Sequence, residues 1–154
     1  MKRDIRVLFV EDDPASVELM LHALRVAGFH PEHIRVDSAR EFEVALKDRP
    51  DVIIADYYVP DFYGIDVLYL MDHCGLDIPV IVVSAALPVG SEEQILRLGA
   101  TAYVRKDELG RLGKAVYDAI SMRKGVCHLS DREYVRASAP LPTKPSLAGT
   151  RGLV

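Results

Sequence analysis

The sequence predicts an α/β fold in which helices cover both faces of a parallel sheet. Five short apolar runs, rich in β-branched residues, alternate with segments whose apolar residues recur at helical spacing. Strands that alternate with helices in this way are typical of a parallel sheet. The five units fill residues 1–123 of the 154-residue chain, so we expect one compact domain followed by a linker or flexible tail over 124–154.

The composition favours a soluble, cytoplasmic protein. Apolar residues make up 49% of the chain, and the formal net charge is −4, which gives no general attraction to nucleic acid or anionic lipid. The longest apolar stretch, residues 78–87, is too short to cross a bilayer, and the N-terminus has no signal-peptide pattern. Cys74 and Cys127 lack metal-ligand spacing and are interpreted as reduced thiols.

The first strand and helix have clear boundary signals. Residues 5–10 (IRVLFV) suit a strand buried on both faces. Asp13 is expected to cap the next helix, and Pro14 suits its first position. Gly28 ends this helix, whose apolar face is formed by Val17, Met20, Leu21 and Leu24.

The second and third units follow directly. Residues 34–36 predict a weaker strand, and Ser38 can cap a helix that ends before Pro50. Residues 52–55 (VIIA) predict the third strand, with Asp56 at its carboxyl end. The apolar positions of the intervening helix are Phe42, Ala45 and Leu46.

The third helix follows the loop 57–64 and ends at Gly75; its apolar positions are Ile65, Leu68 and Tyr69. Residues 80–83 predict the fourth strand, with Ser84 at its end. Ser91 suits the start of the fourth helix, in which Ile95 and Leu98 face inward before Gly99.

Residues 101–104 predict the fifth strand, with Lys106 just beyond it. Gly110 and Gly113 weaken the first half of the last helix, whose apolar stripe consists of Leu109, Leu112, Val116 and Ile120.

The chemistry is expected at the carboxyl ends of the strands, where open parallel sheets bind their ligands. Carboxylates from two strands converge there, and their mutual repulsion favours a cation between them. Oxygen ligands favour a hard divalent ion, and Mg²⁺ is the usual intracellular choice. The residues at these ends are Glu11, Asp12, Asp13, Asp56, Ser84 and Lys106.

A carboxylate beside Mg²⁺ can act as a nucleophile toward phosphorus. Phosphoryl transfer needs alignment and stabilisation of the charge on the three equatorial oxygens. Mg²⁺ can hold one oxygen, Lys106 a second, and the Ser84 hydroxyl with nearby N–H groups the third. These groups are sufficient to form an aspartyl phosphate at Asp56.

Four motifs carry a resemblance to a known family: FVEDDP, DVIIADYYVPDFYGIDVL, PVIVVSA and AYVRKD. In order and spacing, over about residues 4–123, the chain resembles the response-regulator receiver domain of two-component signalling. The resemblance implies a flavodoxin-like, doubly wound, five-stranded parallel sheet with strand order 2-1-3-4-5 and five helices.

The resemblance also implies roles for individual residues. Asp56 would accept the phosphoryl group, and Glu11 and Asp12 would hold Mg²⁺ together with Asp56 and the backbone carbonyl of Tyr58. Ser84 would be the switch hydroxyl and Tyr103 the switch aromatic. Lys106 would be the phosphate-binding lysine.

A histidine kinase or a histidine phosphotransfer protein would be the donor. The chain would be a phospho-acceptor that catalyses only its own phosphorylation and dephosphorylation. Phosphorylation would change a partner-binding or homodimer face formed by the fourth helix, fifth strand and fifth helix. Residues 124–154 contain no second helical pair of the kind that binds DNA, so no direct nucleic-acid binding and no membrane insertion are expected.

The chain has two departures of note from the family pattern. Asp107 follows Lys106 where the family commonly has a proline after a cis peptide bond, and a cis bond to a non-proline residue costs about 3–4 kcal/mol. The loop is therefore either trans or strained. Tyr58 and Ala86 occupy the positions that flank the attacking water in the family, and we expect Tyr58 to slow self-dephosphorylation.

Three alternatives remain open to test. A phosphorylation-independent docking module of the same fold is disfavoured by the intact Asp12, Asp56 and Lys106. A metal-dependent phosphatase would need an aspartate at position 58, and a flavin-binding protein would need a Ser/Thr-rich loop after the first strand. The aromatic loop of Tyr57, Tyr58, Phe62 and Tyr63 favours local packing over partner docking.

Overall fold

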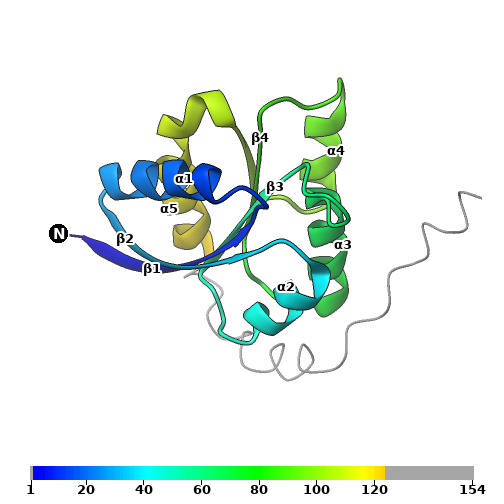
Figure 1. The fold of residues 1–154 in the computed structure, drawn as a ribbon, viewed down its shortest axis with the longest axis horizontal. Helices are drawn as coiled ribbons and strands as arrows, with labels where there is room; N and C mark the ends of the chain where they lie inside the picture. Colours follow the sequence, from blue (N-terminus) through cyan, green and yellow to red (C-terminus); the bar gives the residue numbers. More distant parts are fainter. Residues whose placement is uncertain (1, 124–154) are drawn as a thin grey trace, which may run out of the picture.

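The computed structural model describes residues 2–123, which form a single five-stranded sheet with helices on both faces (Figure 1). The strand order is β2-β1-β3-β4-β5, and all neighbouring strands are parallel. The predicted fold class and strand order are confirmed. The expected tail over 124–154 and Cys127 lie outside the described residues, so the domain boundary stays a prediction.

The elements alternate as predicted. The strands are β1 (Arg3–Val10), β2 (Phe29–Val36), β3 (Val52–Asp56), β4 (Val80–Ser84) and β5 (Ala102–Arg105). The helices are α1 (Pro14–Val26), α2 (Ala39–Leu46), α3 (Gly64–Cys74), α4 (Ser91–Arg97), the 3₁₀-helix η1 (Lys106–Arg111) and α5 (Leu112–Arg123). Within residues 2–123, none of these helices has the length and apolar content to cross a membrane.

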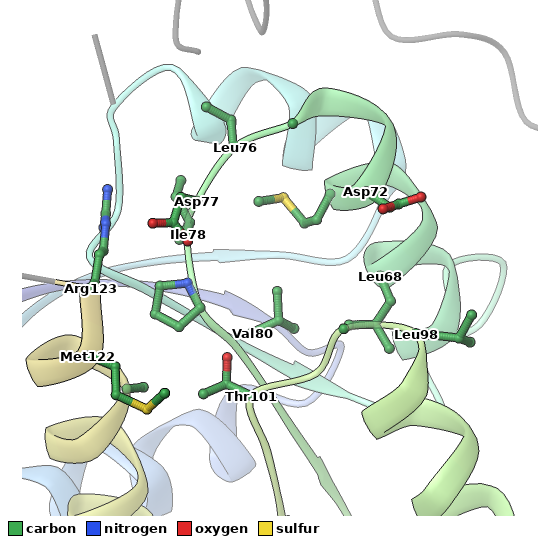
Figure 2. A pocket seen from close by; sticks show the side chains of 15 residues that line it. Leu68, Asp72, Leu76, Asp77, Ile78, Val80, Leu98, Thr101, Met122 and Arg123 are labelled. Atoms are coloured by element: carbon green, nitrogen blue, oxygen red, sulfur yellow. The ribbon is translucent and has the colours of Figure 1, made fainter. Parts of the chain in front are cut away.

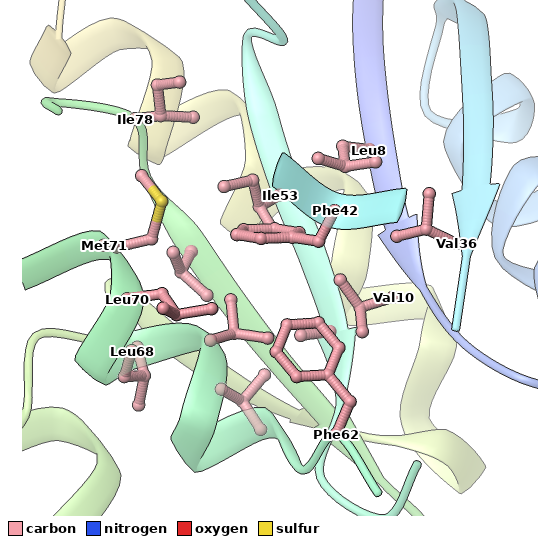
Figure 3. Close-up of a cluster of buried hydrophobic side chains, with 14 of the residues drawn as sticks. Leu8, Val10, Val36, Phe42, Ile53, Phe62, Leu68, Leu70, Met71 and Ile78 are labelled. Atoms are coloured by element: carbon pink, nitrogen blue, oxygen red, sulfur yellow. The ribbon is translucent and has the colours of Figure 1, made fainter. Parts of the chain in front are cut away.

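Two apolar layers hold the helices to the sheet. α1 and α5 cover one face, and α2, α3 and α4 cover the other (Figure 1). Alternate residues of a strand point to opposite faces, so Phe9 of β1 packs toward α1 and α5 while Leu8 packs toward α2 and α3. Figure 3 shows the second layer, in which the rings of Phe42 and Phe62 lie 5.5 Å apart. Both faces of β1 and β3 are therefore buried.

Capping residues fix the helix ends. Asp13 caps α1 by accepting a hydrogen bond from the Ala15 N–H at 3.0 Å, and Ser38 caps α2 by accepting from the Glu41 N–H at 3.3 Å. Gly75 ends α3 with φ of 64°, a left-handed conformation that favours glycine. These three predictions are confirmed.

β2 is longer than predicted. The apolar run 34–36 indicated only its last part, whereas the strand pairs with β1 from Phe29 to Val36. β2 is an edge strand, and the residues between its buried ends are mostly exposed. Its hydrogen bonds to β1 need no apolar side chains, so the hydrophobic pattern does not reveal them.

The start of the last helix also differs. The segment from Lys106 to Arg111 is a 3₁₀-helix, and α5 begins only at Leu112, which agrees with the weakening expected from Gly110. Gly113 allows close packing, because a Cβ there would lie 2.2 Å from the Cβ of Ala27. In α3, Leu68 is buried as predicted, but Tyr69 is 48% exposed and does not join the apolar face.

Candidate functional site

The carboxyl ends of the strands bring the predicted site residues to one edge of the sheet. β1 lies beside β3, so the acids that follow these strands are neighbours. Asp56 pairs with Val83, and Ser84 pairs with Arg105, directly before Lys106. The arrangement follows from parallel pairing, which places all carboxyl ends at the same edge.

Lys106 lies at the centre of the site. Its Nζ donates hydrogen bonds to Glu11 Oε2 and Asp56 Oδ2, both at 2.8 Å, and to Ser16 Oγ at 3.3 Å. The Lys106–Asp107 peptide bond is trans. The lysine therefore reaches both acids without the cis peptide bond that is common in the family that the sequence resembles.

The three predicted acids form a group suited to a divalent cation. Glu11, Asp12 and Asp56 each offer a carboxylate oxygen, and these oxygens all lie within 4.8 Å of one another. Glu11 is 1% exposed and Asp56 is 7% exposed, whereas Asp12 is exposed. Carboxylates in this arrangement fit a hard ion such as Mg²⁺, which keeps several waters and binds one or two carboxylates. The exposed Asp12 lies on the solvent side of the group.

Burial and pairing change the protonation of this site. Burial raises the pKa of Glu11 to about 7, although the hydrogen bonds from Lys106 and the Asp13 N–H oppose the shift. Burial alone would lower the pKa of Lys106, but its hydrogen bonds to Asp56 and Glu11 outweigh burial and raise the pKa. Lys106 is therefore positively charged throughout the physiological range and supplies the positive charge between the two buried acids.

Both oxygens of Asp56 have a hydrogen-bond donor. Oδ2 accepts from Lys106, and Oδ1 accepts from the Tyr58 N–H at 3.2 Å. The Tyr58 ring is 49% exposed and packs edge-to-face on Tyr57, with ring centroids 4.7 Å apart. The Tyr58 carbonyl as a metal ligand stays a prediction.

Ser84 and Tyr103 are not joined to the acidic group in this structure. The Ser84 hydroxyl is fully buried and donates to the Ala86 carbonyl at 2.7 Å. Tyr103 is partly buried against the apolar layer under α3 and α4, and burial raises the pKa of its hydroxyl despite the opposing charge of Arg105. The roles predicted for them require these side chains to move.

Two further residues of the site were missed by the sequence reasoning. Ser16 contacts Lys106 from the first turn of α1; the signal was its position one turn after the acidic residues. Gly64 packs closely on the end of β3, because a Cβ there would lie 3.0 Å from the Asp56 carbonyl oxygen and 3.1 Å from Tyr57 Cα. Gly64 donates its N–H to the Tyr57 carbonyl at 3.1 Å, which closes the loop after β3.

The aromatic loop is divided between core and surface. Phe62 is fully buried, as local packing predicts. Tyr63 is 46% exposed, and Tyr58 is likewise half exposed, so these two rings do not belong to the core.

A large hollow lies elsewhere on the molecule. It has a volume of about 600 Å³ and is lined by residues near the amino ends of β4 and β5, including Ile78, Val80 and Thr101, and by the end of α5 (Figure 2). None of the predicted site residues lines it. Size alone does not mark the functional site in this protein.

Comparison with known proteins agrees with the fold. Residues 7–117 match the family described as the response regulator receiver domain. The chain belongs to this family and is a receiver domain of two-component signalling. The predicted family is therefore confirmed.

Two curated relatives illustrate the range of this family. The transcriptional regulatory protein PrrA of Mycobacterium tuberculosis is 30% identical over 97% of this chain, which covers 62% of PrrA. The polar-differentiation response regulator DivK of Brucella anthropi is 35% identical over 65% of this chain and 82% of its own length. The chain thus spans about three fifths of PrrA and aligns with most of DivK.

Solved structures show the same fold. The receiver domain of a LuxO repressor protein from Vibrio parahaemolyticus has a TM-score of 0.70 and 25% identity over 80% of this chain and 95% of its own. The receiver domain of the response regulator NarL from Mycobacterium tuberculosis has a TM-score of 0.67 and 25% identity over 77% of this chain and 98% of its own.

Proposed function

We propose that Asp56 accepts a phosphoryl group from a histidine kinase or a histidine phosphotransfer protein. The observation that carries this proposal is the position of Lys106, whose ammonium lies 2.8 Å from both Asp56 and Glu11. A carboxylate held beside a fixed cation, with two further acids for a divalent ion, matches the needs of phosphoryl transfer.

The proposed reaction needs no other nucleophile. A carboxylate oxygen of Asp56 attacks phosphorus, a P–O bond forms, and the P–N bond to the donor histidine breaks. The electron pair leaves with the imidazole nitrogen, and Lys106 stabilises charge on the phosphoryl oxygens. When Mg²⁺ is bound by Glu11, Asp12, Asp56 and the Tyr58 carbonyl, it supplies further stabilisation of this charge.

The output is a shift between two conformations. After transfer, the Ser84 hydroxyl leaves the Ala86 carbonyl and donates to a phosphoryl oxygen, and Tyr103 repacks. The face formed by α4, β5 and α5 then changes its affinity for a partner or for a second copy of the chain. We propose that this output acts through protein contacts in the cytoplasm. The net charge of −4 gives no general attraction to nucleic acid, so direct nucleic-acid binding is not part of the proposal.

The chain is thus a switch and a phosphoryl acceptor, and it catalyses only its own phosphorylation and dephosphorylation. A phosphorylation-independent docking module is the alternative, but such a module would not need buried acids paired with a lysine.

A small phosphodonor tests the proposal directly. The full chain is incubated with acetyl phosphate and Mg²⁺, and its intact mass is measured. We expect a gain of one phosphoryl group that is lost in hydroxylamine, as an acyl phosphate is. Asp56→Asn should abolish the gain, and Asp72→Asn, a change at an exposed aspartate on α3, should not. An unmodified wild-type chain would favour the docking module.

A further inference from the structure

Lys106 has a third hydrogen-bond partner that the proposed reaction does not use. A lysine ammonium has three N–H donors, and here they point to Glu11, Asp56 and Ser16. Two of these partners are carboxylates, and their charge or their contacts change when a cation or a phosphoryl group binds at the site. The Ser16 hydroxyl is the neutral partner, and its charge does not change during the reaction.

Ser16 is itself held in a fixed orientation. Its hydroxyl donates to Asp13 Oδ2 at 3.2 Å, while Asp13 Oδ1 accepts from the Ala15 N–H at 3.0 Å to cap α1. Because the Ser16 proton is directed to Asp13, the lone pairs of Ser16 Oγ are available to the Lys106 ammonium. The cap of α1 and the lysine are therefore connected through one hydroxyl.

The backbone around Lys106 provides little anchoring of its own. Lys106 begins η1, which contains no buried residue and is interrupted by Glu108 with φ of −124° and ψ of 38°. A lysine side chain has four rotatable bonds and a large rotamer entropy. The position of the ammonium therefore depends on its side-chain partners.

We infer that Ser16 is a positioning residue that holds the Lys106 ammonium in place while Asp56 is phosphorylated. This inference rests on the proposed function. As Asp56 becomes an acyl phosphate, its bond to Lys106 is replaced by a bond from Lys106 to a phosphoryl oxygen. Ser16 keeps its bond throughout and limits how far the ammonium can move.

The test compares Ser16→Ala, Ser16→Thr and wild type in the full chain, with Mg²⁺ and varied acetyl phosphate. Because the Lys106–Ser16 hydrogen bond is long, at 3.3 Å, we assign it the ordinary strength of a single hydrogen bond, and its loss predicts a maximal phosphorylation rate reduced about two- to tenfold, with an unchanged half-saturating donor concentration. Ser16→Thr keeps the hydroxyl and should restore the rate. Ser121→Ala, at an exposed serine on α5, should have no effect.

A double-mutant cycle separates positioning from a general effect on α1. If Ser16 acts through the lysine, Ser16→Ala should change nothing further in a Lys106→Met background. An equal reduction in both backgrounds, or no reduction in wild type, would overturn the inference.

A second measurement does not depend on phosphorylation. In ¹⁵N-lysine spectra, the Lys106 ammonium should give a slowly exchanging signal in wild type that broadens in Ser16→Ala and returns in Ser16→Thr. If wild type shows this pattern but takes no phosphoryl group, the proposed function fails while the contact is upheld. An ammonium signal that is the same in all variants would contradict the role of Ser16.

Discussion

At the scale of single residues, the site is defined by one cation between two buried acids. Glu11 and Asp56 are almost completely buried, and Lys106 is the ammonium that contacts both. Buried carboxylates without such a partner would carry a large desolvation cost. The stability of the metal-free protein should therefore depend on this lysine.

Lys106→Met should lower the free energy of unfolding by about 1–3 kcal/mol near neutral pH without divalent ions. The reason is that Glu11 and Asp56 stay buried but lose the ammonium that offsets their desolvation. Urea unfolding followed by circular dichroism measures the change.

Lys114→Met is the matched control, because Lys114 makes an exposed ion pair with Asp118 at 2.8 Å. Such surface pairs contribute about 0–1 kcal/mol. Added Mg²⁺ should reduce the loss in Lys106→Met by supplying the missing charge. A loss equal to that of Lys114→Met would contradict the importance of the buried pairing.

Tyr58→Ala should accelerate loss of phosphate from the phosphorylated chain. The Tyr58 N–H contacts Asp56, and the Tyr58 ring is half exposed, so we expect the ring to restrict the approach of water to a phosphoryl group on Asp56. The N–H remains in the variant, so only the shielding changes. The half-life is read from the intact mass after removal of the donor.

Tyr69→Ala is the control for this experiment, since Tyr69 has a similar exposure of 48% but lies within α3 and not in the loop directly after Asp56. Equal half-lives for Tyr58→Ala and wild type would show that the ring does not shield the phosphoryl group.

At the scale of elements, the close approach of α1 and α5 depends on one missing side chain. Gly113 faces Ala27 at a distance that leaves no space for a Cβ, and a helix gains stability from alanine only where the space is open.

Gly113→Ala should therefore destabilise the protein by about 1–3 kcal/mol, because the added methyl group overpacks the contact between the helices. Gly110→Ala is the matched change, since no atom lies within 4 Å of a Cβ there, and it should alter stability by no more than about 0.5 kcal/mol. Thermal unfolding of both variants gives the comparison. Similar unfolding midpoints for the two variants would show that α1 and α5 can move apart to accept the methyl group without a loss of stability.

Elements also show where sequence reasoning succeeds. Continuous apolar runs predicted β1, β3 and β4 because these strands are buried on both faces and lie inside the sheet. It found only the end of β2, an edge strand whose pairing depends on backbone groups. The position of Lys106 followed from the strand order, but its link to Ser16 depends on side-chain geometry that no sequence period encodes.

The direction of the Ser84 hydroxyl is a similar case. The sequence placed Ser84 at the end of β4, which is correct. Whether the hydroxyl points to Asp56 or to the backbone depends on the turn that follows. In this structure it points to the Ala86 carbonyl.

At the scale of the whole molecule, the acidic site and the end of α5 lie apart. The acids and Lys106 occupy the carboxyl edge of the sheet. Arg123, at the end of α5, donates to the carbonyls of Pro50 and Asp51, both at 3.3 Å, before β3 begins. These bonds attach the last turn of α5 to the opposite edge.

A chain shortened to end at Lys124 should therefore keep its fold and its acidic site. Arg123 and its contacts remain, so we expect the free energy of unfolding to change by no more than about 0.5 kcal/mol, and acetyl phosphate to modify Asp56 at an unchanged rate. Urea unfolding and intact mass test both points. A marked loss of stability would show that residues 125–154 contribute to the domain.

The resting contact of Ser84 has a consequence for signalling. Its hydroxyl is enclosed by protein, but the carbonyl that it contacts belongs to Ala86, an exposed residue. When the hydroxyl turns away, solvent water can hydrogen-bond to that carbonyl, so the departure leaves no unpaired polar group. If Ser84 turns to the phosphoryl group as proposed, we expect the barrier to activation to lie in moving the short turn after β4, and sequence changes in that turn to tune how often an unphosphorylated chain signals by itself.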